Sequence, residues 1–202
     1  MHYEDLTFYR DDGSDTAGFV NVYPKVLNVG WLDRNYPYTK GDIPQKIIQK
    51  LKELTFLDMK NSEDKKHGIF EKNKAVIIHL MHMRGAPYKC SLCGGEVGEI
   101  TINPGGLDVY QGTQQMLLGR SEMCIPDSGG DLFYSFPTML YHYVVDHQYC
   151  PPADFLKAVD QFNMHAPYNI EKEQDDLECL QMPVDQLHDI DRQQGVINKS
   201  IK

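Results

Sequence analysis

Apolar and polar positions alternate most regularly between residues 42 and 54. The apolar residues Ile47, Ile48, Leu51 and Leu54 recur every three to four positions, which is the period of a helix with one buried face. An acidic residue at position 42 can cap this helix, and the proline at position 44 is tolerated in a first turn. Residues 60–74 are polar and charged, so the pattern predicts a loop after the helix.

Two shorter helices are predicted in the second half of the chain. One begins after Ser135, has Pro137 in its first turn and carries an apolar stripe up to His147. The two prolines at 151 and 152 end that segment. The second proline can open another helix, which ends near Met164.

The remaining apolar segments predict strands. The best candidates are Val26 to Leu32, which contains the single tryptophan, and the apolar run Ala75 to Met83. Glycines then interrupt the chain repeatedly between residues 94 and 130, as expected of short strands joined by turns. We therefore predict an α+β fold, in which a small mostly antiparallel sheet packs against about three helices.

Length and composition predict one domain followed by a tail. A chain of 202 residues with 41% hydrophobic residues can bury one sizeable core. Residues 171–178 are dominated by acids, glutamines follow Met182, and few apolar residues remain to be buried. We expect residues 1–165 to form the α+β domain and residues 166–202 to form an acidic, partly ordered tail.

The charge of the chain disfavours nucleic acid as a partner, and its hydropathy disfavours a membrane. The formal net charge is −9 and the isoelectric point is about 5.3, so a phosphate backbone would be repelled. The lysines between positions 40 and 74 have only two aromatic residues among them, Phe56 and Phe70, and such a charged stretch is typical of a solvated face. No run of about 18 apolar residues and no cationic leader occur, so we expect a cytoplasmic protein that binds neither nucleic acid nor membrane.

The cysteines indicate a metal site instead of a disulfide framework. Five is an odd number, and two of the five form a C-x-x-C pair, Cys90 and Cys93, followed by two glycines. Thiolates converge at this spacing because the backbone between them turns tightly. The other three, Cys124, Cys150 and Cys179, are interpreted as free thiols.

A histidine pair completes a candidate zinc site. His142 and His147 are spaced as H-x4-H, which allows two imidazoles near a helix end to reach one ion. Together with Cys90 and Cys93 they would form a tetrahedral site without an open position, which indicates a structural zinc ion and not a catalytic one. The alternative is that the cysteines pack as small apolar residues while the histidines line a helix.

A zinc-dependent hydrolase is a second alternative. If one histidine did not bind, the metal would keep an open position, and Asp146 or Glu99 could act as a base near a bound water. The sequence contains no phosphate-binding, dinucleotide-binding or H-E-x-x-H motif and no G-x-S-x-G elbow. His79 and His82 lie in an apolar run and are interpreted as core or edge residues.

Several motifs together resemble a family of small bacterial proteins of unknown function. They are the segment Asn28 to Asp33, the pair Arg84-Gly85, the C-x-x-C pair and the stretch H-Y-x-x-x-H-x-Y-x-P-P-x-x-F from His142 to Phe155. The likeness runs from about Tyr3 to Val159. It implies a bacterial cytosolic protein with a bound metal and no known activity. Ala86-Pro87 stands where the family tends to have an aromatic residue and a histidine.

These observations favour a protein-binding module over an enzyme. Acidity, small size and a closed metal site suit an immunity or antitoxin-like protein that blocks a basic effector. The zinc-dependent hydrolase is the alternative, and the coordination of the metal distinguishes the two. The sequence leaves the partner and the oligomeric state open.

Overall fold

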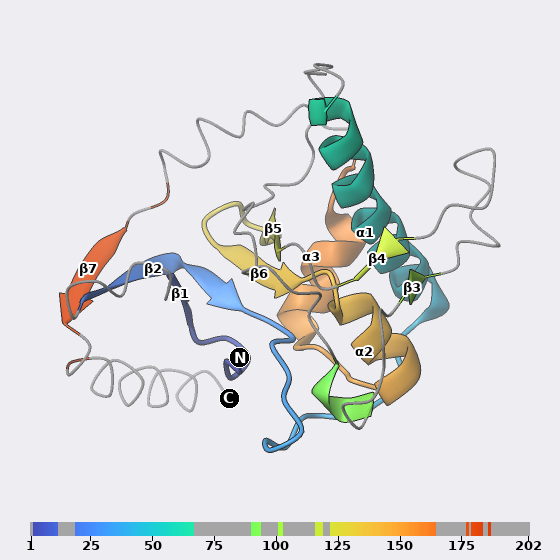
Figure 1. Cartoon of the computed structure of the whole chain (residues 1–202), viewed down its shortest axis with the longest axis horizontal. Coiled ribbons are helices and arrows are strands. Elements are labelled where there is room, and N and C mark those ends of the chain that lie inside the picture. Colours follow the sequence, from blue (N-terminus) through green and yellow to red (C-terminus); the bar gives the residue numbers. More distant parts are fainter. Residues whose placement is uncertain are drawn as a thin grey trace.

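The computed structural model describes residues 2–11, 19–66, 90–93, 101–102, 116–118, 122–164, 177, 179–183 and 186. Within these residues the chain forms a mixed five-stranded sheet, a separate two-stranded sheet and three α-helices (Figure 1). The predicted α+β class is confirmed. The predicted strand Ala75 to Met83, with His79 and His82, lies outside the described residues, as do Arg84, Gly85 and Glu99.

The larger sheet is built around one long strand, β2. Its path runs β1–β2–β6–β5, and β7 also pairs with β2. The β1–β2, β2–β7 and β5–β6 pairs are antiparallel, whereas β2 and β6 run parallel. The strands are β1 (Phe8–Asp11), β2 (Phe19–Asn28), β5 (Glu122–Pro126), β6 (Phe133–Pro137) and β7 (Leu180–Pro183). The small sheet pairs β3 (Thr101–Ile102) with β4 (Met116–Leu117).

The first strand prediction was only partly right. The strand extends further toward the N-terminus than Val26 and ends at Asn28 instead of Leu32. Gly30 adopts a φ of 71°, a left-handed conformation that interrupts a strand. Trp31 follows as an isolated bridge to Tyr3, and it is 3% exposed, in keeping with a packing role.

The hairpin of β5 and β6 replaces part of a predicted helix. The helix is predicted to begin after Ser135, but Phe136 and Pro137 continue β6, whose five residues are all buried. Residues 133–137 pair with β5, and residues 133–135 also pair with β2. Trp31 also donates its indole N–H to the Ser135 carbonyl over 3.3 Å. Strand pairing thus overrides the helical signal of Pro137, which stands at the end of the strand, where its missing N–H costs least.

The three helices are α1 (Gln45–Lys66), α2 (Leu140–His147) and α3 (Ala153–Gln161). The predicted first helix is confirmed, and Ile47, Leu51 and Leu54 are buried as its spacing indicates. The predicted loop at 60–74 is wrong for residues 60–66, which continue α1. Those residues include lysine and glutamate, which favour helices, and no glycine or proline stands between positions 45 and 67.

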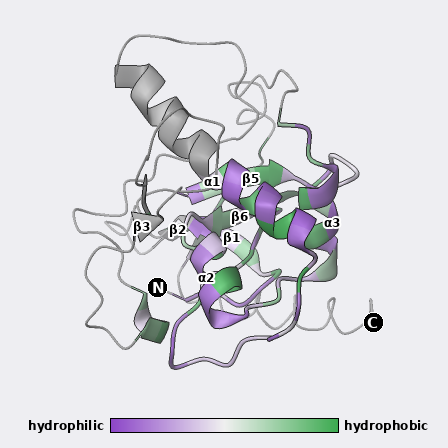
Figure 2. Ribbon diagram, turned by 90° about the vertical axis from the view of Figure 1, so that its right-hand side faces the viewer, coloured by the Kyte–Doolittle hydropathy of each residue, from purple (hydrophilic) through white to green (hydrophobic). Residues whose placement is uncertain are grey.

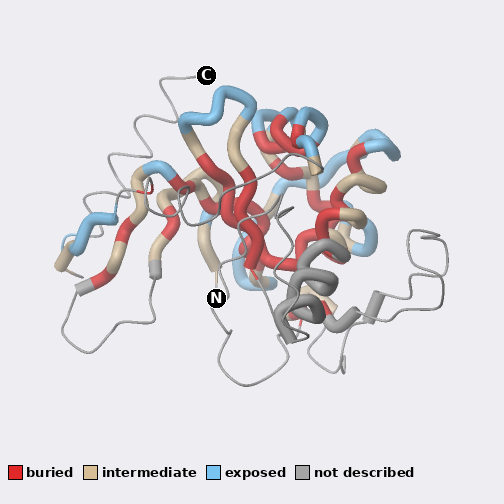
Figure 3. Tube along the Cα trace, turned by 90° about the horizontal axis from the view of Figure 1, so that it is seen from above, coloured by how far each residue is buried: buried red, intermediate tan, exposed pale blue. Residues whose placement is uncertain are grey.

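The helices lie on one side of the molecule and enclose most of the core. Figure 1 places α1, α2 and α3 together, away from β1 and β7, and α1 packs against both other helices. Hydrophilic and hydrophobic residues both occur along α3, whose Phe155, Ala158 and Val159 are buried (Figure 2). Figure 3 shows buried residues concentrated in the central strands and on the helix faces beside them.

Apolar residues form two clusters of unequal size. The larger joins α1, α2, α3, β5 and β6 and includes Leu51, Met123, Phe136, Leu140 and Phe155. The smaller consists of Tyr9, Val26, Cys124, Phe133 and Leu177. Among the described residues, no helix is both long and apolar enough to cross a membrane.

Candidate metal centre

The two cysteines of the C-x-x-C pair lie in one tight turn. Residues Ser91–Cys93 form a 3₁₀ turn, and the Cys93 amide donates to the Cys90 carbonyl over 3.3 Å. The Ser91 hydroxyl accepts the backbone N–H of Arg34 at 3.1 Å, which fastens the turn to the segment after β2. Cys90 is fully buried, and Cys93 is half-buried. The backbone therefore presents both thiols from one short segment.

The two histidines come from helix α2. His142 is buried at 6% exposure, and His147 is the last residue of the helix. Residues five apart on a regular helix point about 140° apart, so two imidazoles converge more easily where the helix ends. Gln148 follows with a φ of 56°, a left-handed conformation that ends α2, and the Tyr149 amide donates to the Tyr143 carbonyl over 3.0 Å.

The end of α2 is held by the segment before α1. The Gly41 amide donates to the Gln148 carbonyl over 3.1 Å, and the Cys150 amide donates to the Thr39 carbonyl over 2.9 Å. The Tyr38 hydroxyl donates to the His147 carbonyl over 3.4 Å. These contacts fix the backbone beside His147, so its imidazole starts from a defined position.

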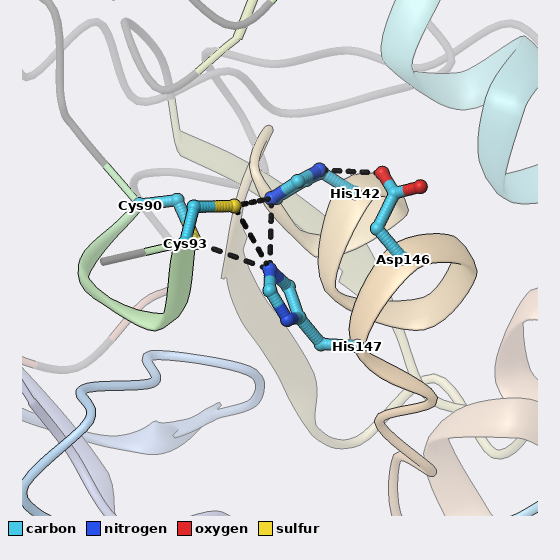
Figure 4. Close-up of polar contacts among 5 residues, drawn as sticks. All are labelled: Cys90, Cys93, His142, Asp146 and His147. Carbon is cyan, nitrogen blue, oxygen red and sulfur yellow. Dashed lines mark hydrogen bonds and ion pairs between the residues drawn. The ribbon is translucent and has the colours of Figure 1, made fainter. Parts of the chain in front are cut away.

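The structure brings all four predicted residues together. Figure 4 shows the cysteines of the turn facing the two histidines of α2, and one ligand atom from each residue lies within 4.8 Å of every other. His147 Nε2 is 3.4 Å from Cys90 Sγ, 3.2 Å from Cys93 Sγ and 3.1 Å from His142 Nε2. His142 Nε2 is 3.3 Å from Cys93 Sγ. This Cys/His cluster could hold a metal ion.

Protons alone do not account for these four contacts. The His142 Nδ1–H donates to Asp146 Oδ2 over 2.6 Å, because a carboxylate can only accept, and a neutral ring then has no proton on Nε2. Among neutral side chains, three protons at most then remain for four contacts: two on the thiols and one on His147. A single cation at the centre would accept all four lone pairs.

Burial determines the charge of the cluster. Burial, the largest cause, raises the pKa of the Cys90 thiol to about 11, so the thiol is neutral at pH 7. Burial, together with repulsion from His142, lowers the pKa of His147 below its ordinary 6.5. A divalent cation has the opposite effect on a thiol, because a thiol that coordinates the cation loses its proton. Burial thus disfavours the charged forms of Cys90 and His147, and their lone pairs favour a positive ion.

A second buried polar cluster lies beside α2. Tyr149, fully buried, donates its hydroxyl to the Asp5 carboxylate at 2.7 and 2.8 Å, and the Gly30 amide donates to Asp5 Oδ1 over 2.9 Å. A Cβ on Gly30 would collide with Leu140 Cδ1 at the start of α2. We call Asp5, Gly30 and Tyr149 the Asp5 cluster.

Sequence patterns did not identify the Asp5 cluster. Gly30 and Tyr149 each stand inside a motif of the family resemblance, whereas Asp5 does not, and no motif indicates that the three residues meet. Asp146 was considered only as a base in the hydrolase alternative, but its position four residues after His142 was a usable signal, since residues at that spacing share a helix face. The remaining cysteines, Cys124, Cys150 and Cys179, are free thiols.

Comparison with known proteins gives one family match. A family model described as a domain of unknown function, DUF7919, matches residues 1–160. The match is consistent with the resemblance to a family of unknown function, while the individual motifs of that resemblance stay predictions. No curated protein and no solved structure matches the chain.

Proposed function

Because the chain belongs to the DUF7919 family, a domain of unknown function, we propose its function from the Cys/His cluster: Cys90, Cys93, His142 and His147 hold one structural zinc ion in a protein-binding module. The observation that carries the proposal is the convergence of four donor atoms from two segments some 50 residues apart. The zinc ion joins the turn at 90–93 to α2.

The distances between donor atoms fit a tetrahedral zinc site. Zn–S and Zn–N bonds of about 2.3 and 2.05 Å place sulfur and nitrogen about 3.6 Å apart, and two nitrogens about 3.3 Å apart. The three sulfur–nitrogen contacts measure 3.4, 3.3 and 3.2 Å, and the nitrogen–nitrogen contact measures 3.1 Å. These four contacts are slightly shorter than a zinc ion requires, and the other two pairs of donor atoms lie within 4.8 Å of each other, so the cluster is close to the size required.

The chemistry of the donors favours zinc over the common hard cations. Two thiolates and two imidazoles are soft or borderline ligands, whereas magnesium and calcium prefer oxygen. Four protein ligands also complete the coordination shell that structural zinc sites have. The ion would then stabilise the fold, and substrate would find no open position on it.

A measurement of metal content tests the zinc site. We expect the purified full-length chain to carry one equivalent of zinc, and Cys93→Ser and His147→Ala to carry substoichiometric zinc with a lower melting temperature. Cys179→Ser is the matched control, because it removes an exposed thiol that is separate from the cluster. Equal zinc content in all four proteins would overturn the proposal.

The coordination of the metal also tests the hydrolase alternative. X-ray absorption of the zinc-loaded chain should report two sulfur and two nitrogen neighbours and no bound water. A water in the fourth position would remove the argument for a structural role and favour the hydrolase.

The proposed partner is a basic protein, such as a toxic effector that this chain would block as an immunity or antitoxin-like protein. The net charge of −9 supports this choice, because an acidic surface attracts a basic partner and repels nucleic acid. Calorimetric titration of the zinc-loaded chain with each basic protein encoded beside it should reveal a complex that weakens as salt increases. Absence of binding to every such protein would contradict this part of the proposal.

A further inference from the structure

One acidic side chain contacts the Cys/His cluster from outside it. Asp146 lies four residues after His142 on α2, and its Oδ2 is 2.6 Å from His142 Nδ1. In Figure 4 the carboxylate stands on the side of the His142 ring that faces away from the cysteines. The Asp146 side chain is 58% exposed, whereas that of His142 is 8% exposed. One end of the ring therefore meets the carboxylate while the other end faces the cluster.

This contact determines which nitrogen of His142 carries the proton. A carboxylate accepts hydrogen bonds and cannot donate one, so the proton resides on Nδ1. The Nε2 lone pair of the neutral ring is then directed at the cluster, where Cys93 Sγ lies 3.3 Å away and His147 Nε2 lies 3.1 Å away. A metal ion requires such a lone pair, and the opposite tautomer would present a proton to it.

The position of Asp146 is unfavourable for the helix itself. It is the second-last residue of α2, where the helix dipole is negative and a negative side chain is destabilising. The pair with His142 is also half exposed, and such pairs contribute little to stability. Helix stability therefore does not explain an acidic residue here, but orientation of a metal ligand does.

The geometry points to Asp146 as a positioning residue that holds His142 in the tautomer whose Nε2 binds the metal. This inference rests on the proposed metal site and adds a residue outside the four ligands. Outer partners of metal-bound histidines commonly change metal affinity by about 10–100-fold when they are removed. We expect an effect of this size on zinc affinity, with little change in the stability of the metal-free chain.

Nitrogen-15 NMR of the full-length chain tests the tautomer directly. In the metal-free wild type we expect the His142 signals of the form protonated on Nδ1, and in Asp146→Ala a shift toward the other tautomer. Asp146→Glu retains the carboxylate and should restore the wild-type signals. A His142 ring that has the same tautomer in the wild type and in Asp146→Ala would overturn the inference.

Zinc affinity, measured by competition with a chelator, is the second readout. Asp146→Ala should bind zinc about 10–100-fold more weakly, and Asp146→Asn, which keeps an acceptor without the charge, should fall between it and the wild type. Asp160→Ala is the matched control, because it removes one partly exposed acidic group from α3, where Asp160 pairs with Lys46. Equal losses of zinc affinity in Asp146→Ala and Asp160→Ala would show that the change in net charge causes the loss, and would overturn the inference.

The two proposals can fail separately. A wild-type chain that binds no zinc contradicts the proposed function, and the NMR measurement on the metal-free chain still decides the role of Asp146. A chain that binds zinc equally well with and without the carboxylate contradicts the positioning role alone.

Discussion

Two buried polar clusters meet helix α2, and they satisfy their polar atoms in opposite ways. In the Asp5 cluster, donors and acceptors match, since one carboxylate receives the Tyr149 hydroxyl and the Gly30 amide. In the Cys/His cluster, two sulfur and two nitrogen atoms make four contacts, and the neutral side chains have at most three protons for them. A matched cluster supports a fold by itself, whereas a cluster rich in lone pairs requires a cation.

The largest expected effect is the loss of the stability that a bound zinc ion gives to the Cys/His cluster. Zinc should raise the unfolding free energy of the wild type by about 4 kcal/mol when free zinc is about 1,000 times Kd. Cys93→Ser should lose that increment, because the remaining donors no longer complete the site. Urea unfolding with and without zinc measures it, and an increment retained in Cys93→Ser would show that zinc acts elsewhere.

A substitution at Gly30 should affect both clusters together. Gly30→Ala places a Cβ against Leu140 of α2 at a residue with a φ of 71°. Left-handed strain and steric overlap should cost about 3 kcal/mol of unfolding free energy. Urea unfolding measures the cost, and Gly130→Ala is a matched control, since its φ is 82° and nothing lies within 4 Å of its Cβ position. Equal costs in Gly30→Ala and Gly130→Ala would show that the overlap with Leu140 contributes nothing to the loss of stability.

A substitution at Tyr149 should affect the Asp5 cluster alone. Tyr149→Phe removes a hydroxyl donor from a partly buried carboxylate, and the loss of a hydrogen bond to a charged group should cost about 1.5–3 kcal/mol. Zinc content should stay at one equivalent, because the hydroxyl points to Asp5. Urea unfolding and metal analysis of the same sample measure both quantities. A loss of zinc in this variant would show that the two clusters are not independent.

The smallest effect concerns the pH dependence of stability. Burial, the largest cause, raises the pKa of Asp5 above its ordinary 3.8, although Gly30 and Tyr149 oppose the shift. The folded chain therefore holds this proton more tightly than the unfolded chain. Its contribution to stability is greatest below pH 3.8, decreases as pH rises through the folded pKa, and is constant above it.

Asp5→Asn isolates this contribution, because asparagine does not ionise. The unfolding free energy of Asp5→Asn minus that of the wild type should increase as pH rises through the acid range and then level off. Urea unfolding of both proteins across a pH series gives the difference, in which the other titrating groups largely cancel. A difference that is the same at every pH would contradict the raised pKa.

Local patterns predicted the parts of this molecule that depend on neighbours in sequence. The buried face of α1 followed from the spacing of Ile47, Leu51 and Leu54, and the four residues of the Cys/His cluster followed from two short motifs. The turn and the helix end each bring two of these side chains close within a few residues, so local spacing was informative there.

Long-range pairing accounts for what those patterns missed. Phe136 and Pro137 extend a strand instead of beginning a helix, because both pair with β5 while residues 133–135 of the same strand pair with β2 and β5. The Asp5 cluster joins residues 144 positions apart, which no local motif reports. The division into residues 1–165 and a tail stays a prediction.

The pairing of β2 with β7 bears on how the chain reaches its folded form during synthesis. Strand β7 lies beyond the residues matched by the family model, and it pairs with residues about 160 positions earlier. That part of β2 therefore stays without this neighbour until residues 180–183 have left the ribosome, while its backbone amides and carbonyls remain available to other strands. Assembly of this sheet edge is accordingly a late event, set by the order in which the chain emerges.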